Sequence, residues 1–325
     1  MWQIRITKKI KNSFESLINR ELMQPQSALD KAQSAILLEK GKYNATNNRY
    51  KVLDELSDFR GFLLKTPREH DILIKRWNKM FPTLFWRKAK NGHYKKTAFC
   101  ERILKALNYE GFREKYAKEI ASIINLKTCP YCNAALTIVA NSSIGKKKAR
   151  FQLDHYYAKS KHPLFCISFF NLIPSCGNCN QSKGSKNVLL GKDFHLYTEA
   201  NTKDLFEFEI PKQNVAKFIF SKNREDIEIV FKSGSSGNDK NTIHHNNAFD
   251  IDGIYETQKD VAEELILKHL AYSKSQIDDL SNLLKLPSSV INRMVIGNYV
   301  DREDIHKRPL AKFTQDIARQ LGLIK

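Results

Sequence analysis

The sequence predicts an α+β fold in three parts: a mainly helical region at residues 1–125, a small strand-containing core at 126–192, and a mixed strand and helix region at 193–325. Three observations support this division. Apolar residues recur at helical spacing in the first part, two pairs of cysteines bracket β-rich runs in the second, and strand-like runs precede a helical tail in the third. The hydrophobic content of 42% and the aromatic content of 10% argue against global disorder.

Two apolar stripes predict helices in the first part. One consists of Leu53, Leu56, Phe59 and Leu63, and the other of Phe112, Tyr116, Ile120 and Ile123. Each stripe places apolar side chains three or four residues apart, which puts them on one face of a helix. Gly or Pro at positions 61, 67, 82 and 92 marks breaks between the predicted helices.

The chain has a formal net charge of +19, and the excess of Lys and Arg lies in its first two-thirds. Counting Lys and Arg against Asp and Glu gives +14 for residues 1–128 (27 against 13), +8 for residues 129–192 (9 against 1) and −3 for residues 193–325 (18 against 21). A directed basic surface of this size indicates a polyanionic partner, and nucleic acid is the first candidate.

Residues 72–105 are the most basic stretch, with ten Lys or Arg and a single acid, Glu101. The aromatic residues that interleave there are Trp77, Phe81, Phe85, Trp86, Tyr94 and Phe99. In one interpretation the cations bind phosphates and the aromatics stack on bases. In the other, the aromatics belong to a helical core and the charges face solvent. We expect core packing for the aromatics and phosphate contact for the basic face.

Short runs with strand character begin after residue 128. Residues 136–140 and 149–153 are β-rich and flank a Lys-rich loop at 141–148. Residues 206–210, 217–220 and 227–232 are predicted strands, and the Ser, Gly and Asn-rich residues 233–247 are a predicted exposed loop that contains His244 and His245. In the tail, Leu310, Phe313, Ile317 and Leu321 predict a helix that starts near Pro309 and stops near Gly322.

Four of the six cysteines form two CxxC pairs, Cys129 with Cys132 and Cys176 with Cys179. The two-residue spacing lets both thiolates of a pair face one ion, and two pairs close a tetrahedral zinc site with no open position. Such a site is structural. The 43 residues between the pairs are more than a compact zinc ribbon contains, so a further structure is expected there. Cys100 and Cys166 are expected to be ordinary core residues.

Asp154 and His155 end the second β-rich run, and Asn180 directly follows the zinc ligand Cys179. A histidine suits a general base because its unperturbed pKa lies near neutrality. A carboxylate and an amide oxygen suit a hard cation such as Mg²⁺. A paired Asp and His satisfied by local hydrogen bonds is the alternative, and the two flanking CxxC pairs argue against it.

Residues 128–186 resemble the zinc-containing branch of the HNH, or ββα-metal, endonucleases. The shared pattern is CxxC, then Asp154 and His155 at the end of the first strand, Asn171 as the central asparagine on the second strand, and CxxC followed by Asn180 and a lysine. The last position is asparagine, so the chain is an HNN variant, and its spacing also resembles the HNH domain of type II CRISPR effectors. The resemblance implies a ββα-metal HNH core stapled by a four-cysteine zinc site. Because asparagine is a poor ligand for soft metals, Mg²⁺ or Mn²⁺ is expected as the catalytic ion.

The resemblance also implies a mechanism. His155 activates a water that attacks phosphorus, and Asp154 and Asn180 hold the catalytic metal. Asn171 hydrogen-bonds across the strand pair and holds the His155 loop. We expect Arg150, Lys183 and Lys186 to contact phosphates.

The expected function is cleavage of DNA in bacterial antiviral defence or restriction. Residues 307–322 resemble the closing segment of HNH proteins that stand beside an ATPase in Septu-type phage defence, which implies an ATPase partner. An RNA-cleaving HNH nuclease and a non-catalytic zinc module that binds nucleic acid or a protein are the alternatives. No apolar stretch of membrane-spanning length and no signal peptide is seen, so a cytoplasmic location is expected.

Overall fold

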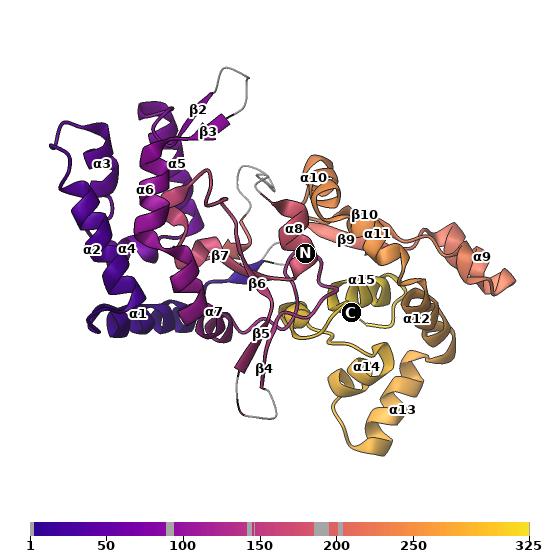
Figure 1. Ribbon diagram of the computed structural model, residues 1–325. Helices are drawn as coiled ribbons and strands as arrows, with labels where there is room; N and C mark the ends of the chain where they lie inside the picture. The colour runs from indigo at the N-terminus through magenta and orange to yellow at the C-terminus, as the bar shows by residue number, and fades with distance from the viewer. Residues whose placement is uncertain are drawn as a thin grey trace.

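The computed structural model describes residues 3–88, 94–141, 145, 147–184, 195–200 and 204–324. The predicted α+β class is confirmed. Helices dominate both ends of an elongated molecule, and small two-stranded sheets lie mostly between them (Figure 1). The parts of the chain that the structure describes contain five such sheets, none larger than a pair of strands.

Helices fill most of the N-terminal region. They are α1 (Lys8–Leu22), α2 (Ala28–Lys40), α3 (Asn48–Asp54), α4 (Phe59–Leu63), α5 (Pro67–Met80), α6 (Ala98–Leu107) and α7 (Tyr109–Ile124). Side-chain oxygens of Thr7, Ser27 and Thr97 accept backbone N–H groups at helix starts, which satisfies donors that the helices leave unpaired. The predicted stripe at residues 53–63 spans two helices, because Asp58 caps a new helix by accepting from the Gly61 N–H at 2.9 Å.

Two strand pairs interrupt the N-terminal region, which is mainly helical as predicted. β1 (Ile4–Arg5) pairs in parallel with β8 (Tyr197–Thr198), and β2 (Trp86–Lys88) pairs antiparallel with β3 (Tyr94–Lys96). The interleaved aromatics are largely core, as expected: the Trp77 and Phe165 rings lie 5.4 Å apart, and the rings of Phe85 and Phe99 lie 5.9 Å apart.

The middle of the chain folds as two hairpins and a short helix. β4 (Ile138–Asn141) pairs antiparallel with β5 (Lys147–Arg150), and β6 (Gln152–His155) pairs antiparallel with β7 (Leu172–Ser175). Two 3₁₀ turns, Pro163–Phe165 and Phe169–Asn171, lie between β6 and β7, and α8 (Gly177–Lys183) follows β7. Asp154 and His155 therefore end a strand, as predicted.

The N-terminal helices and the middle segment share one hydrophobic core. Phe165 and Phe169, which lie between β6 and β7, insert among the N-terminal helices. The Phe14 and Phe169 ring centroids are 4.7 Å apart, and the Phe62 and Phe165 rings stack at 5.7 Å. Residues on both sides of position 125 therefore pack in the same hydrophobic core.

The C-terminal region combines one hairpin with helices. β9 (Phe206–Glu209) pairs antiparallel with β10 (Val230–Ser233). The helical elements are α9 (Lys212–Ser221), a 3₁₀ turn (Arg224–Asp226), α10 (Asp239–Phe249), α11 (Ile251–Glu256), α12 (Lys259–Ala271), α13 (Lys274–Leu284), α14 (Ser288–Ile296), a second 3₁₀ turn (Arg302–Lys307) and α15 (Ala311–Gln320). The predicted tail helix is α15.

Two predictions in this region are wrong. Residues 217–220, predicted as a strand, belong to α9, because the apolar residues are part of a longer helical segment in which Phe218 is the buried position. Residues 239–247 of the predicted exposed loop form most of α10, which Asn238 caps by accepting from the Asn241 N–H at 2.9 Å. His245 on α10 is completely buried and stacks on Phe206.

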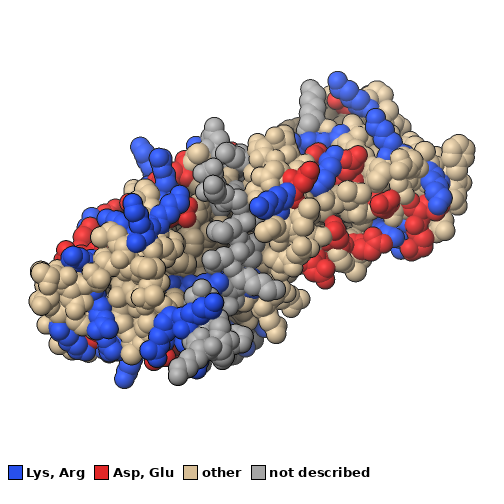
Figure 2. Space-filling model, turned by 90° about the horizontal axis from the view of Figure 1, so that it is seen from above, with Lys and Arg blue, Asp and Glu red and all other residues tan. Residues whose placement is uncertain are grey.

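The face of the molecule in Figure 2 reflects the uneven charge of the sequence. Lys and Arg predominate over the N-terminal half, while Asp and Glu mix with them over the C-terminal half. The two-stranded hairpins add to the basic character of the N-terminal and middle segments, because all four residues of β5 are exposed and three of them are Lys or Arg.

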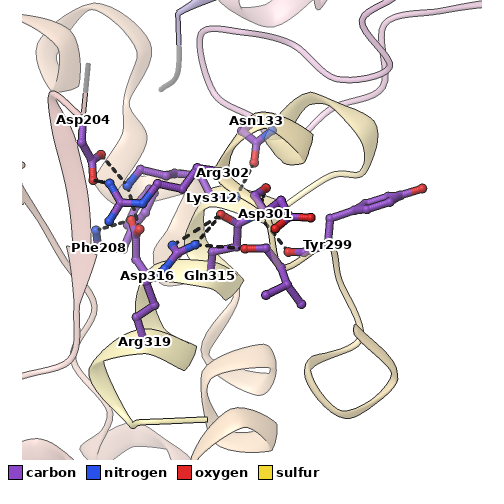
Figure 3. Close-up of polar contacts among 11 residues, drawn as sticks. Asn133, Asp204, Phe208, Tyr299, Asp301, Arg302, Lys312, Gln315, Asp316 and Arg319 are labelled. Carbon is purple, nitrogen blue, oxygen red and sulfur yellow. Dashed lines mark hydrogen bonds and ion pairs between the residues drawn. The ribbon is translucent and has the colours of Figure 1, made fainter. Parts of the chain in front are cut away.

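A buried ionic network fixes α15 to the rest of the protein (Figure 3). The Lys312 ammonium, 2% exposed, lies 2.9 Å from Asp204 and 2.7 Å from Asp316. The Lys312 N–H donates to the Asn133 side chain at 2.9 Å, and the Leu310 N–H donates to the Asn133 carbonyl at 2.7 Å. The start of α15 is thereby attached to the loop that carries Cys129 and Cys132.

Replacing Lys312 tests this network. Lys312→Ala leaves the buried Asp316 without its cation, while Asp204 keeps Arg302, so we expect a loss of about 3 kcal/mol in the free energy of unfolding. Lys307→Ala is the matched control, because Lys307 forms an exposed pair with Asp304 and its loss costs about 1 kcal/mol or less. Urea unfolding of both variants measures the difference, and equal small losses would contradict a stabilising role for the network.

Candidate functional site

The four cysteines of the two CxxC pairs come together. Their sulfur atoms all lie within 4.8 Å of one another, so the cluster could hold a metal ion. Four sulfurs and no open position are typical of a structural zinc site, as the spacing predicted. Hydrogen bonds from Cys129 lower the pKa of Cys176 and of Cys132. Burial raises the pKa of Cys129, and a hydrogen bond with Cys129 raises that of Cys179, so the four thiols share protons among themselves.

Cys176 also starts the helix that carries Asn180. It is the N-cap of α8, and its sulfur accepts the Cys179 N–H at 3.4 Å. On the other pair, the Cys132 carbonyl accepts the Tyr255 hydroxyl at 2.8 Å, and the Tyr131 carbonyl accepts the His245 Nε2–H at 3.0 Å. The C-terminal region therefore supports the first CxxC loop directly, and His245 has a structural role.

Asp154 is buried, and each of its carboxylate oxygens has a partner. Its carboxylate accepts from the Tyr131 hydroxyl, and the Lys183 ammonium lies 3.0 Å from it. Burial raises the pKa of Asp154, and Lys183 opposes this rise. Asp154 also lines the cleft described below. The Lys183 ammonium balances the negative charge of the Asp154 carboxylate.

Lys183 does not have the position that was predicted for it. We expected an exposed phosphate contact, but the side chain is 1% exposed, and its ammonium also donates to the His155 carbonyl at 2.5 Å. The reason is helical geometry: Lys183 follows Asn180 by three residues, so both project from one face of α8 toward β6. Its charge balances Asp154 inside the protein.

His155 is held in one orientation at the end of β6. Its Nε2 lies 2.8 Å from the Cys166 carbonyl, which can only accept, so Nε2 carries the proton and Nδ1 carries the lone pair. None of the hydrogen bonds within the described ranges engages Nδ1. Burial lowers the pKa of His155 to about 3, so the ring is neutral at pH 7 and a weaker base than a histidine in water. The Tyr109 ring packs against it at 4.4 Å.

Asn171 is completely buried and holds the chain on both sides of the imidazole. Its Oδ1 accepts the Tyr157 N–H at 2.7 Å, and its Nδ2 donates to the carbonyl of Tyr157 at 3.1 Å and of Phe165 at 2.9 Å. Tyr157 follows His155 by two residues, and Phe165 precedes the carbonyl that orients the ring. Asn171 ends a 3₁₀ turn, one residue before the strand on which it was predicted.

Asp154, His155 and Asn180 line one cleft of about 420 Å³. Asn180 projects from α8 and donates its Nδ2–H to the Gln152 side chain on β6. The complete lining is Tyr109, Glu110, Arg113, Gln152, Leu153, Asp154, His155, Ala158, Lys159, Ser160, Asn180 and Gly184. The structure thus brings together three residues that the sequence placed up to 26 positions apart.

The cleft also contains residues that the sequence did not single out. Tyr109, Glu110 and Arg113 come from α7 in the N-terminal region, and Lys159 follows the His155 loop. The apolar stripe predicted the helix α7, but the sequence did not indicate that the first turn of this helix packs against β6. Of the predicted phosphate contacts, Arg150 is exposed on β5, and Lys186 lies outside the described residues.

Loss of one sulfur ligand tests the metal site. We expect about one zinc ion per chain by mass spectrometry of the metal content, and a large fall in both zinc content and unfolding temperature for Cys176→Ser, because a structural zinc stabilises the fold directly. Cys100→Ala is the control: this cysteine is buried away from the cluster and should leave the zinc content unchanged. Full zinc content in Cys176→Ser would contradict the four-sulfur assignment.

Comparisons with known proteins identify no relative. No family model, no curated protein and no solved structure matches this chain. Within the described residues, none of the helices combines the length and the apolar character that a membrane crossing requires.

Proposed function

We propose that this protein is a metal-dependent HNH endonuclease that hydrolyses phosphodiester bonds of DNA. The observation that carries the proposal is the placement of His155: an imidazole at a strand end, oriented through Nε2, with Nδ1 free of the described hydrogen bonds, in a cleft shared with Asp154 and Asn180. A zinc module that only binds nucleic acid has no need of an oriented base, so the arrangement favours catalysis.

In the proposed reaction His155 acts as the general base. Nδ1 accepts a proton from a water molecule in the cleft, and the Cys166 carbonyl stabilises the positively charged ring through Nε2–H. Asn171 keeps the His155 loop and the segment that carries the carbonyl in register, so the imidazole does not need to reorganise during proton transfer. In this mechanism His155 activates the water and Asn171 positions His155, so no further base is required.

Asp154 and Asn180 would hold the catalytic Mg²⁺ or Mn²⁺. Their oxygen donors suit a hard cation, and both side chains line the same cleft. When bound, the metal would stabilise negative charge on the phosphate. Tyr131 and Lys183 fix the direction of the Asp154 carboxylate before any metal arrives.

We further propose a role in bacterial antiviral defence, in association with an ATPase, on the sequence resemblance of residues 307–322. Four polar residues of that segment lie inside the protein, Lys312, Thr314, Gln315 and Asp316, and Lys312 and Asp316 serve the internal network. An ATPase would therefore contact the outer surface of the C-terminal region. A nuclease that acts on RNA is the second candidate, because a general base and a metal ion can promote hydrolysis of the phosphodiester bonds of either DNA or RNA.

The cleavage assay compares His155→Ala with His244→Ala, an exposed histidine on α10. With Mg²⁺ the wild type and His244→Ala should nick plasmid and lose activity in EDTA, while His155→Ala should be slower by about 10² or more, because general-base catalysis contributes that much. Zinc content and DNA binding should be unchanged. Equal cutting by His155→Ala would exclude its proposed role, and cleavage confined to single-stranded RNA would favour the second candidate.

A further inference from the structure

The first turn of α7 forms one wall of the cleft, and its position is fixed locally. Asn108 joins α6 to α7 in a left-handed conformation (φ 39°) and accepts the Gly111 N–H at 3.4 Å. A side chain at Gly111 would collide with Asn108, because its Cβ would lie 2.6 Å from the Asn108 amide nitrogen. The Tyr109 hydroxyl donates to the Leu153 carbonyl on β6 at 3.0 Å. The turn is thus attached directly to the strand that carries His155.

Two cations meet on this turn. The Lys159 ammonium lies 3.1 Å from one oxygen of Glu110, and Arg113 lies 3.0 Å from the other. Lys159 also lies over the Tyr109 ring, 4.4 Å from its centre, and the same ring contacts the His155 imidazole. One carboxylate therefore holds both cations at the cleft, next to the proposed base.

Both cations keep exposed ends. The side chains of Lys159 and Arg113 are 41% and 50% exposed, whereas Lys183 is buried. The backbone around Lys159 is also held in place relative to His155. Asn171 accepts the N–H of Tyr157, which lies between them in the sequence. After it, the Ala158 carbonyl accepts the N–H groups of Lys161 and His162. Positive charge that is held in place and still open to solvent suits a phosphate group.

We propose that Lys159 and Arg113 bind a backbone phosphate adjacent to the one that is cleaved, so that the N-terminal helical region completes the substrate site. This inference rests on the proposed nuclease function. Glu110 keeps the two cations apart and oriented before substrate binds, and the phosphate replaces it as their partner. Neighbouring charge extends the site: the Lys118 ammonium donates to the Lys147 carbonyl at 3.1 Å, which ties the exposed basic strand β5 to α7.

Binding is tested on full-length protein that carries His155→Ala to prevent cutting, with a short DNA duplex over a range of salt concentrations. Arg113→Gln and Lys159→Gln should each weaken binding by about 3- to 10-fold and reduce the slope of log K against log salt by about 1, the loss of one phosphate contact. Glu110→Gln should bind more tightly, because it removes an acid that competes with phosphate. Lys212→Gln, at the exposed start of α9, is the control and should behave as the parent.

Kinetics of the same substitutions with His155 intact separate this inference from the proposed function. Arg113→Gln and Lys159→Gln should raise KM more than they lower kcat, since the two cations position substrate. The inference is overturned if Arg113→Gln and Lys159→Gln both keep the DNA affinity, the salt dependence and the KM of the parent protein. That result would leave the nuclease assignment standing. A wild-type protein that cuts neither DNA nor RNA would overturn the nuclease function itself. Unchanged zinc content in each variant verifies folding.

Discussion

The site depends on the closure of the four sulfurs, which joins two segments separated by 43 residues. α8 has seven residues, too few to be stable as an isolated helix, so its position is set by the cysteines at its start. From that fixed start Asn180 and Lys183 reach β6, where Gln152 and Asp154 receive them. The geometry of the cleft therefore depends on the four-sulfur cluster.

Two buried polar groups around this closure have partners that come from other parts of the chain. Asp154 is satisfied by Tyr131 and Lys183, and Asn171 by backbone groups on two separate turns. An unpaired buried charge or amide would cost more than these interactions contribute, so the network permits few alternative arrangements. The C-terminal region also stabilises this arrangement, because the Lys312 N–H at the start of α15 donates to the Asn133 side chain.

The N-terminal helices have two roles that share one structural cause. Their core continues into the turns between β6 and β7, through contacts such as Phe14 with Phe169 and Trp77 with Phe165. That shared core brings the first turn of α7 against β6, where it lines the cleft. The basic helical region therefore shares a core with the middle segment and also forms one wall of the candidate site.

The sequence by itself determined the features that depend on spacing along the chain: the two CxxC pairs, the end of β6 at Asp154 and His155, and the helical character of both ends. Only the tertiary structure decided which of these side chains are buried and what they touch. Lys183 was predicted to contact phosphate and His245 to lie in an exposed loop, yet α8 and α10 turn them inward against β6 and the first CxxC loop. Tyr109 reaches His155 across 46 residues of sequence, and no local pattern encodes such a contact, because it arises from the packing of helices whose relative placement depends on the whole core.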